Sequence, residues 1–180
     1  DIPDNRDIYH SMDWSYDKTV EVDLREQCPP IYNQGELGSC TANAIAAAYE
    51  FQEIKEDEDE PFVPSRLFIY YNERDMEGTT QSDAGAAIRD GIKSIAQIGV
   101  VPECDWPYDI SKFTERPDDF CYSLCTHHRS VLYKRVPQDI GSLKACLSSG
   151  LPIVFGFAVY DSFETIGEDG IMPLPQEGES

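Results

Sequence analysis

The chain has 180 residues, of which 41% are hydrophobic and 11% aromatic, enough to bury the core of one ordinary domain or two small ones. Its net charge of −20 would repel nucleic-acid phosphates and anionic membrane surfaces, so we expect neither as a partner. Because no run of about 18 apolar residues occurs, we also expect no segment that spans a membrane.

The N-terminal part begins with an arm and leads into a helix. Residues 1–20 lack periodicity and are expected to form an extended arm that could act as a prosegment. Residues 20–25 alternate apolar and polar side chains, which predicts a short strand, and Pro29 and Pro30 then stop it. The alanine-rich stretch that follows predicts a buried helix over about 41–54.

Two further helices are predicted in the middle of the chain. One covers about 65–74, with Ser65 as its N-cap after a proline. The other begins with Asp83 as a cap, repeats isoleucine at helical spacing over 88–95, and closes at Gly99. The first 110 or so residues are therefore expected to be mainly helical.

The pattern changes in the C-terminal part. Residues 102–120 are expected to be irregular, and residues 130–136 have the composition of a strand. A short helix is predicted over about 139–148, and the continuous apolar run 152–160 predicts a buried strand. A helical lobe, a β lobe and a cleft between them follow from this order, and catalytic sites favour such interfaces.

Residues 34–40 carry the strongest chemical signal. They read as a glycine-hinged loop that brings Cys40 to the first turn of the alanine-rich helix. A thiol at that place is stabilised as the thiolate by the helix dipole, which makes it a better nucleophile. The side-chain amide of Gln34 and the backbone N–H of Cys40 could together hold the oxyanion of an acyl-transfer intermediate.

The run Asn33–Cys40 also resembles the hallmark of the papain-like cysteine peptidases, N-Q-G-x-x-G-S-C entering a long helix. The resemblance extends over about residues 20–172. Its weaker matches fall in the family's order: Val22-Asp23-Leu24-Arg25, Asp83-Ala84-Gly85, the stretch from Gly99 to Tyr108 with Glu103, Trp106 and Pro107 in register, and Gly150-Leu151-Pro152-Ile153-Val154.

This resemblance implies an α+β fold of the papain-like, two-lobe type. The helical lobe would be complete over 21–115, after the arm of 1–20, and the first part of the β lobe would occupy 116–180. It implies a cysteine peptidase that acts on peptide or protein substrates and needs no cofactor.

The resemblance also assigns the site residues. Cys40 is the expected nucleophile, and Gln34 the expected oxyanion donor. Gly38, Gly85 and Ala86 are expected to bind substrate, since residues with small or no side chains let its backbone come close. Ala86 would line an apolar subsite with Ile153 opposite.

The family's catalytic His lies about 130–150 residues after the Cys, and an Asn follows it. This chain has only His10, His127 and His128. We therefore expect the His and Asn to come from sequence beyond Ser180, from a C-terminal fragment or from a second chain. Two alternatives stay open: a rearranged site that uses His127 or His128, and a non-catalytic homologue that acts as a peptide-binding or inhibitory protein.

The cysteines favour a reduced protein. Leu37 stands where familiar animal and plant members have the first Cys of C-G-S-C-W, which resembles the microbial or viral branch and removes a disulfide. A reducing, intracellular or virion-like setting fits this better than secretion, although the sequence assigns no compartment. Cys121-x-x-x-Cys125-x-His127-His128 fits no standard zinc spacing, so we expect no metal.

Overall fold

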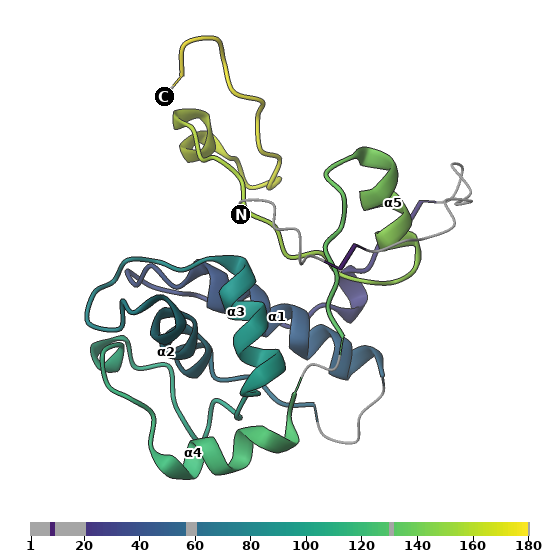
Figure 1. Ribbon diagram of the computed structural model, residues 1–180. Coiled ribbons are helices and arrows are strands. Elements are labelled where there is room, and N and C mark those ends of the chain that lie inside the picture. The colour runs from purple at the N-terminus through teal and green to yellow at the C-terminus, as the bar shows by residue number, and fades with distance from the viewer. Residues whose placement is uncertain (1–7, 10–20, 57–60, 130–131, 180) are drawn as a thin grey trace.

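The structure, a computed structural model, describes residues 8–9, 21–56, 61–129 and 132–179. In these ranges its α-helices are α1 (Cys40–Lys55), α2 (Arg66–Glu77), α3 (Ile88–Gln97), α4 (Asp119–Leu124) and α5 (Ile140–Ser148), as Figure 1 shows. Short 3-10 turns accompany them: η1 (Arg25–Gln27), η2 (Ile110–Lys112), η3 (Cys125–His127) and η4 (Asp161–Thr165). No helix in the described ranges is long and apolar enough to cross a bilayer.

Helices α1, α2 and α3 pack against one another and enclose the main core (Figure 1). On α1 the buried side chains are mostly small, with Ala42 and Ala46 on either side of Ile45, so its neighbours approach closely. On α2 every residue from Arg66 to Arg74 is buried, which makes α2 the central element. The predicted helices over 41–54 and 65–74 are confirmed.

The helix ends follow local rules. The Ser65 hydroxyl accepts a hydrogen bond from the backbone N–H of Phe68 (3.1 Å), as expected of the N-cap of α2. The carboxylate of Asp139 caps α5 in the same way, through the N–H of Ser142 (2.8 Å). The short helix predicted over 139–148 is therefore confirmed, and Gly150 follows it with a left-handed φ of 70°.

Arg74 is a fully buried cation on α2. Its guanidinium donates hydrogen bonds to main-chain carbonyls of Tyr70 (3.1 Å), Thr80 (2.8 Å), Ser82 (3.0 Å) and Phe113, and it stacks on the ring of Tyr70 at 3.9 Å. Burial lowers the pKa of Arg74, while these partners satisfy its donors. The loop that follows α2 is thereby tied to the core.

Helix α4 (Asp119–Leu124) was not expected: residues 102–120 read as irregular, and no element was predicted between 121 and 129. It begins after Asp118, whose carboxylate accepts from the N–H of Cys121 (2.9 Å). Cys121 and Cys125 are buried with Phe68 in a second hydrophobic cluster, and the ring of Tyr122 lies 5.2 Å from that of Phe68. Helix α4 therefore packs on α2. The predicted boundary between the two lobes, at residues 115 and 116, stays a prediction.

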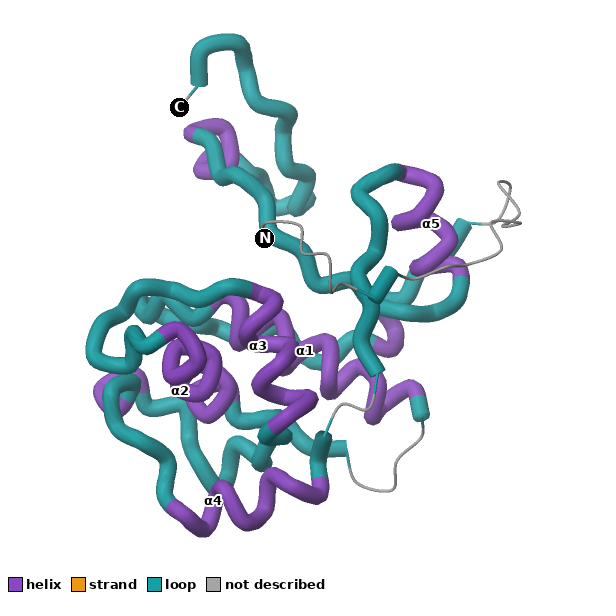
Figure 2. Tube along the Cα trace, in the orientation of Figure 1, coloured by secondary structure: helices purple, strands orange, loops and turns teal. Residues whose placement is uncertain are grey.

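The three predicted strands are wrong for the residues that the structure describes, and Figure 2 shows only helices and loops there. Residues 21–24 are a loop that runs into η1. Within 132–136 there is a single parallel bridge, between Arg135 and Tyr9. Residues 152–160 have no regular structure. The expected β lobe is thus not formed in the described residues.

The physical reason lies in pairing. A strand is stabilised by hydrogen bonds and side-chain contacts with a neighbouring strand, and no described strand lies beside residues 152–160. From Phe155 onward the side chains of this run are exposed, with fractions of 67% for Phe155, 50% for Phe157 and 59% for Val159, whereas Ile153 and Val154 are half-buried. The apolar pattern indicated burial, but the described residues bury only the first part of this run, where Val154 packs against the main core.

Candidate active site

Cys40 is the first residue of α1, and its side chain is exposed to solvent. The first intrahelical bond runs from the N–H of Asn43 to the carbonyl of Ser39 (3.0 Å). The N–H groups of Cys40, Thr41 and Ala42 therefore have no acceptor one turn earlier in the helix. With no acidic residue in this first turn, the positive end of the helix dipole acts on the Cys40 thiol.

Ser39 keeps this helix end uncapped. Although it occupies the N-cap position, its side chain makes no capping bond. Its buried hydroxyl instead lies 2.5 Å from the hydroxyl of Tyr108 and accepts a hydrogen bond from the Asn43 amide (3.0 Å). The amides of the first turn are consequently left for another acceptor, such as a substrate oxyanion.

Gln34 is half-buried, and hydrogen bonds fix both its side chain and its main-chain carbonyl. Its side-chain Nε2 donates to the carbonyl of Leu37 (3.1 Å), and its own carbonyl accepts from the Tyr108 hydroxyl (2.9 Å). One of the two amide hydrogens of Nε2 is thus used to fix the side chain, and the second stays available for a ligand. Leu37 itself is buried in the main core, which anchors the loop between Gln34 and Cys40.

Arg66, at the start of α2, fixes this loop by hydrogen bonds, a role that the sequence did not reveal. The side chain, from the first turn of α2, is buried and donates to the carbonyl of Asn33 (3.1 Å) and to the side chain of Asn43 (3.1 Å). Two parallel bonds of 2.8 and 2.7 Å join it to the carboxylate of Glu103, which raises the pKa of Arg66. Its guanidinium also stacks on Tyr108 at 3.9 Å. One cation therefore connects the loop, α1 and residue 103.

Gly38 and Gly85 face each other. A Cβ placed on Gly85 would lie 3.8 Å from the carbonyl oxygen of Gly38, and Gly85 has a φ of +70°, which favours glycine. Asp83 lies beside them and does not cap α3 as expected, since the N-cap is Ala87. Its carboxylate instead accepts hydrogen bonds from the N–H of Gly38 and from the hydroxyl of Tyr70.

A buried carboxyl group lies beside the first turn of α1. Glu73, on α2, has no exposed surface and accepts a hydrogen bond from the hydroxyl of Thr41 (2.6 Å), the residue after Cys40. Its second oxygen has no hydrogen-bond partner and packs against Gly91 of α3. Burial raises the pKa of Glu73 to about 8, so the group is mostly protonated at neutral pH and places little negative charge near the thiol.

All six cysteines are free thiols. Cys28 and Cys104 are exposed like Cys40, whereas Cys121, Cys125 and Cys146 are buried. Burial raises the pKa of each of these three, that of Cys121 to about 12, so they are poor nucleophiles. Exposure alone therefore does not single out Cys40, but its place at a helix N-terminus does.

The described histidines lie away from Cys40. The ring of His128 packs edge-on against Phe62 at 4.8 Å, and Phe62 lies 6.1 Å from the ring of Tyr49. Tyr49 is nine residues along α1 from Cys40, a rise of about 13 Å. His127 is the adjacent residue, and His10 lies outside the described residues. Within the described ranges, no three His, Cys, Asp or Glu side chains form a group that could hold a metal ion.

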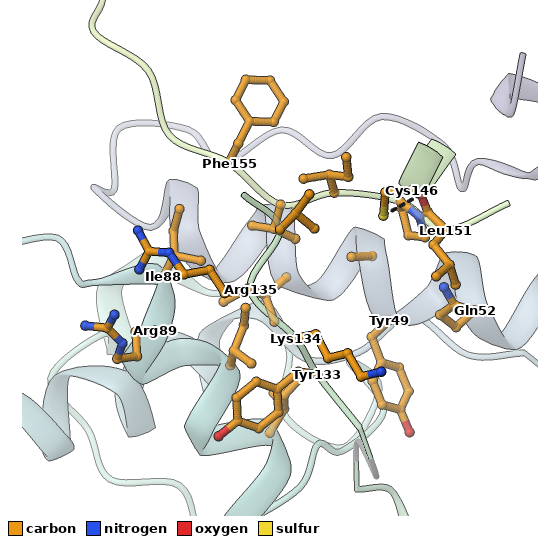
Figure 3. Close-up of a pocket in the computed structure, with 18 of the residues that line it drawn as sticks. Tyr49, Gln52, Ile88, Arg89, Tyr133, Lys134, Arg135, Cys146, Leu151 and Phe155 are labelled. Atoms are coloured by element: carbon orange, nitrogen blue, oxygen red, sulfur yellow. Dashed lines mark hydrogen bonds between the residues drawn. The ribbon is translucent and has the colours of Figure 1, made fainter. Parts of the chain in front are cut away.

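A groove separates α1 and α3 from the segment that contains α5 (Figure 3). Side chains that line it and that Figure 3 labels are Tyr49, Gln52, Ile88, Arg89, Tyr133, Lys134, Arg135, Cys146, Leu151 and Phe155. None of the five predicted site residues lines it, although Ile153 does. The apolar subsite between Ala86 and Ile153 therefore stays a prediction.

Comparison with known proteins adds to this geometry. No protein-family model matches the sequence. The chain is 40% identical to the peptidase C1-like protein L477 of Acanthamoeba polyphaga mimivirus, over 98% of this chain and 66% of the viral protein, so it spans about two thirds of that relative. The crystal structure of xylellain, a cysteine protease from Xylella fastidiosa, superposes with a TM-score of 0.84 and 41% identity, over 100% of this chain and 73% of xylellain.

Sequence identity at this level, together with a backbone that superposes over the whole chain, shows that the chain belongs to the papain-like cysteine peptidase family.

Proposed function

We propose that this chain carries the nucleophile and the oxyanion hole of an enzyme that hydrolyses peptide bonds in peptides or proteins. The observation that supports this most directly is the exposed thiol of Cys40 at the uncapped N-terminus of α1. The fixed amide of Gln34 on the preceding loop adds a second donor. Acyl transfer needs both features: a stabilised thiolate and donors for the oxygen that becomes negative.

In the proposed reaction the Cys40 sulfur attacks the carbonyl carbon of the scissile bond. The oxygen then becomes an oxyanion and accepts hydrogen bonds from the Cys40 N–H and from Gln34 Nε2. The amine leaves with a proton from an imidazolium, which produces a thioester on Cys40. Water, deprotonated by the same imidazole, attacks the thioester and releases the acid, which regenerates the thiolate and the imidazolium.

The imidazole of this scheme comes from outside the 180 residues, together with the Asn that orients it. Both would be supplied by sequence that follows Ser180 or by a second chain. Two observations support this: His127 and His128 lie away from the thiol, and the chain matches only 66% of the viral protein and 73% of xylellain. The substrate backbone would run between Gly38 and Gly85, and Ala86 would line the adjoining subsite.

The first test is selective alkylation at pH 6, followed by peptide mapping. Iodoacetamide should modify Cys40 at least tenfold faster than Cys28 and Cys104, because of these three only Cys40 lies at the N-terminus of an α-helix, whose dipole favours the reactive form of the sulfur. Cys28 and Cys104 are the matched controls, since all three side chains are exposed. Equal rates at the three positions would refute the proposed nucleophile.

The second test is turnover of a fluorogenic peptide by the complete protein, including whatever segment supplies the histidine. Cys40→Ser should abolish hydrolysis, whereas Cys28→Ser and Cys104→Ser should retain it. Peptide binding without turnover in the complete protein would refute the peptidase and support the non-catalytic alternative.

A further inference from the structure

We propose that Asp83 is a positioning residue that holds the two glycine segments of the substrate site, at Gly38 and Gly85, at a fixed separation. The proposal rests on the proposed function, because these glycines matter only if a peptide lies between them. Asp83 belongs to the loop between α2 and α3, which lies beside the start of α1 (Figure 1).

The first link runs from Asp83 to the nucleophile loop, 45 residues away in sequence. Both carboxylate oxygens lie 3.0 Å from the backbone nitrogen of Gly38 and share its hydrogen. A Cβ on Gly38 would lie 2.9 Å from Asp83 Oδ1, so a glycine at this position lets the carboxylate approach. Because the acceptor is charged, this bond is stronger than one between neutral groups.

The second link runs through Tyr70 to Gly85. The Tyr70 hydroxyl donates to Asp83 Oδ1 and accepts from the N–H of Gly85 (3.3 Å). Burial, the largest cause, and the hydrogen bond to Asp83 raise the pKa of Tyr70, so the hydroxyl keeps the proton that it donates. The two glycine N–H groups thus connect through one carboxylate and one phenol.

The rigid core supports this connection. Tyr70 is fully buried on α2, and its ring is stacked against Arg74. Arg74 in turn donates to the carbonyl of Ser82, the residue immediately before Asp83 (3.0 Å). The carboxylate is therefore set in place from two sides, although Asp83 itself lies at the surface.

Loss of this link should affect peptide recognition more than the nucleophile. The loop that carries Cys40 is held separately, by Arg66 on the carbonyl of Asn33 and by Tyr108 on Gln34. Without Asp83 the Cys40 thiol would stay at the N-terminus of α1, whereas the distance between the two glycine segments would no longer be fixed. A residue needed only for folding would lower both properties together.

The test compares two reagents for Cys40: iodoacetamide, which requires only the thiolate, and an epoxysuccinyl dipeptide, which must also bind along the glycine segments. In Asp83→Ala the second-order rate with the dipeptide epoxide should fall about tenfold, the scale of one charge-assisted hydrogen bond at a surface. The rate with iodoacetamide should stay within about twofold of wild type. Asp83→Asn and Tyr70→Phe, which each leave part of the link, should give smaller decreases with the epoxide.

The matched control is Asp109→Ala. Asp109 is also exposed and also accepts from a backbone N–H, that of Ser111 (3.0 Å), but it caps η2 and has no contact with either glycine. Neither rate should change in this variant. Equal loss of both rates in Asp83→Asn, or an epoxide rate that is unchanged in Asp83→Ala, would overturn the proposal. Failure of the proposed function would appear earlier, as wild-type protein in which iodoacetamide does not prefer Cys40.

Discussion

Replacing Glu73 by Gln should remove a large part of the pH dependence of stability. Glu73 has no exposed surface, and burial raises its pKa to about 8 from an ordinary 4.5. The folded protein therefore keeps a proton that the unfolded chain has already released at neutral pH. Since the native state binds more protons, the free energy of unfolding must fall as the pH rises from about 4.5 to about 8.

The size of the effect follows from the two pKa values. One pH unit within this window corresponds to about 1.4 kcal/mol, so wild type should lose about 2–3 kcal/mol between pH 5 and pH 7 through this one group. Glu73→Gln keeps an oxygen for the hydroxyl of Thr41 and does not titrate. Relative to this variant, wild type should therefore become progressively less stable as the pH rises.

Urea unfolding of both proteins at pH 5, 6 and 7, followed by circular dichroism, measures this difference directly. The control is Glu115→Gln, which removes an exposed carboxylate and should retain the wild-type slope. If the difference in stability between wild type and Glu73→Gln is the same at all three pH values, Glu73 is ionised in the folded protein and the reasoning fails.

Three further predictions concern other parts of the site and its frame. Gln34→Ala should lower kcat for a fluorogenic peptide about 100-fold or more, with the iodoacetamide rate of Cys40 unchanged; an unaltered kcat would exclude Gln34 as an oxyanion donor. Arg66→Lys, which loses the pair of parallel hydrogen bonds to Glu103, should lower the free energy of unfolding, measured in urea, by about 2–4 kcal/mol. An unchanged free energy of unfolding would show that this pair of bonds adds no stability. Gly99→Ala should destabilise far more than Gly78→Ala in thermal unfolding. Both glycines have positive φ, but a Cβ on Gly99 would lie 1.9 Å from a backbone oxygen, whereas one on Gly78 would meet nothing. Equal losses would contradict this contact.

The helices could be predicted because their signals are local. The alanine-rich run, Ser65 after a proline, and Asp139 three residues before Ser142 each specify a helix or its cap within a few positions. Asp83 looked like an equally good cap, but its carboxylate is used by Gly38 at the other end of the site. Tertiary structure overrode the local preference, and the sequence near Asp83 contains no trace of that partner.

Charged residues were the main omission at the site. The motif predicted Cys40 and Gln34 directly, whereas nothing in the sequence analysis predicted a part for Arg66 or Glu73 at the site. In the structure both are buried: Arg66 binds the loop that precedes Cys40, and Glu73 binds Thr41 on α1. The match of Glu103 to the family pattern was the available signal for the Arg66 pair, because a buried carboxylate requires a cation or a proton.

The strand predictions failed for a different reason. Alternation and apolar runs indicate which side chains would suit a sheet, but a strand exists only where a second strand meets it. Residues 152–160 have the composition of a buried strand, and their described surroundings contain none.

The anchoring of the loop after α2 by Arg74 has a consequence for a chain proposed to cut peptides. A peptidase can cleave its own exposed loops, and cleavage requires several residues to leave the protein surface in an extended form. Here such a movement would break the bonds of Arg74 to Thr80 and Ser82 and leave a buried cation short of partners. Under the proposed function, opening of this loop for self-cleavage should therefore be costly, and the loop that contains Asp83 should resist autolysis.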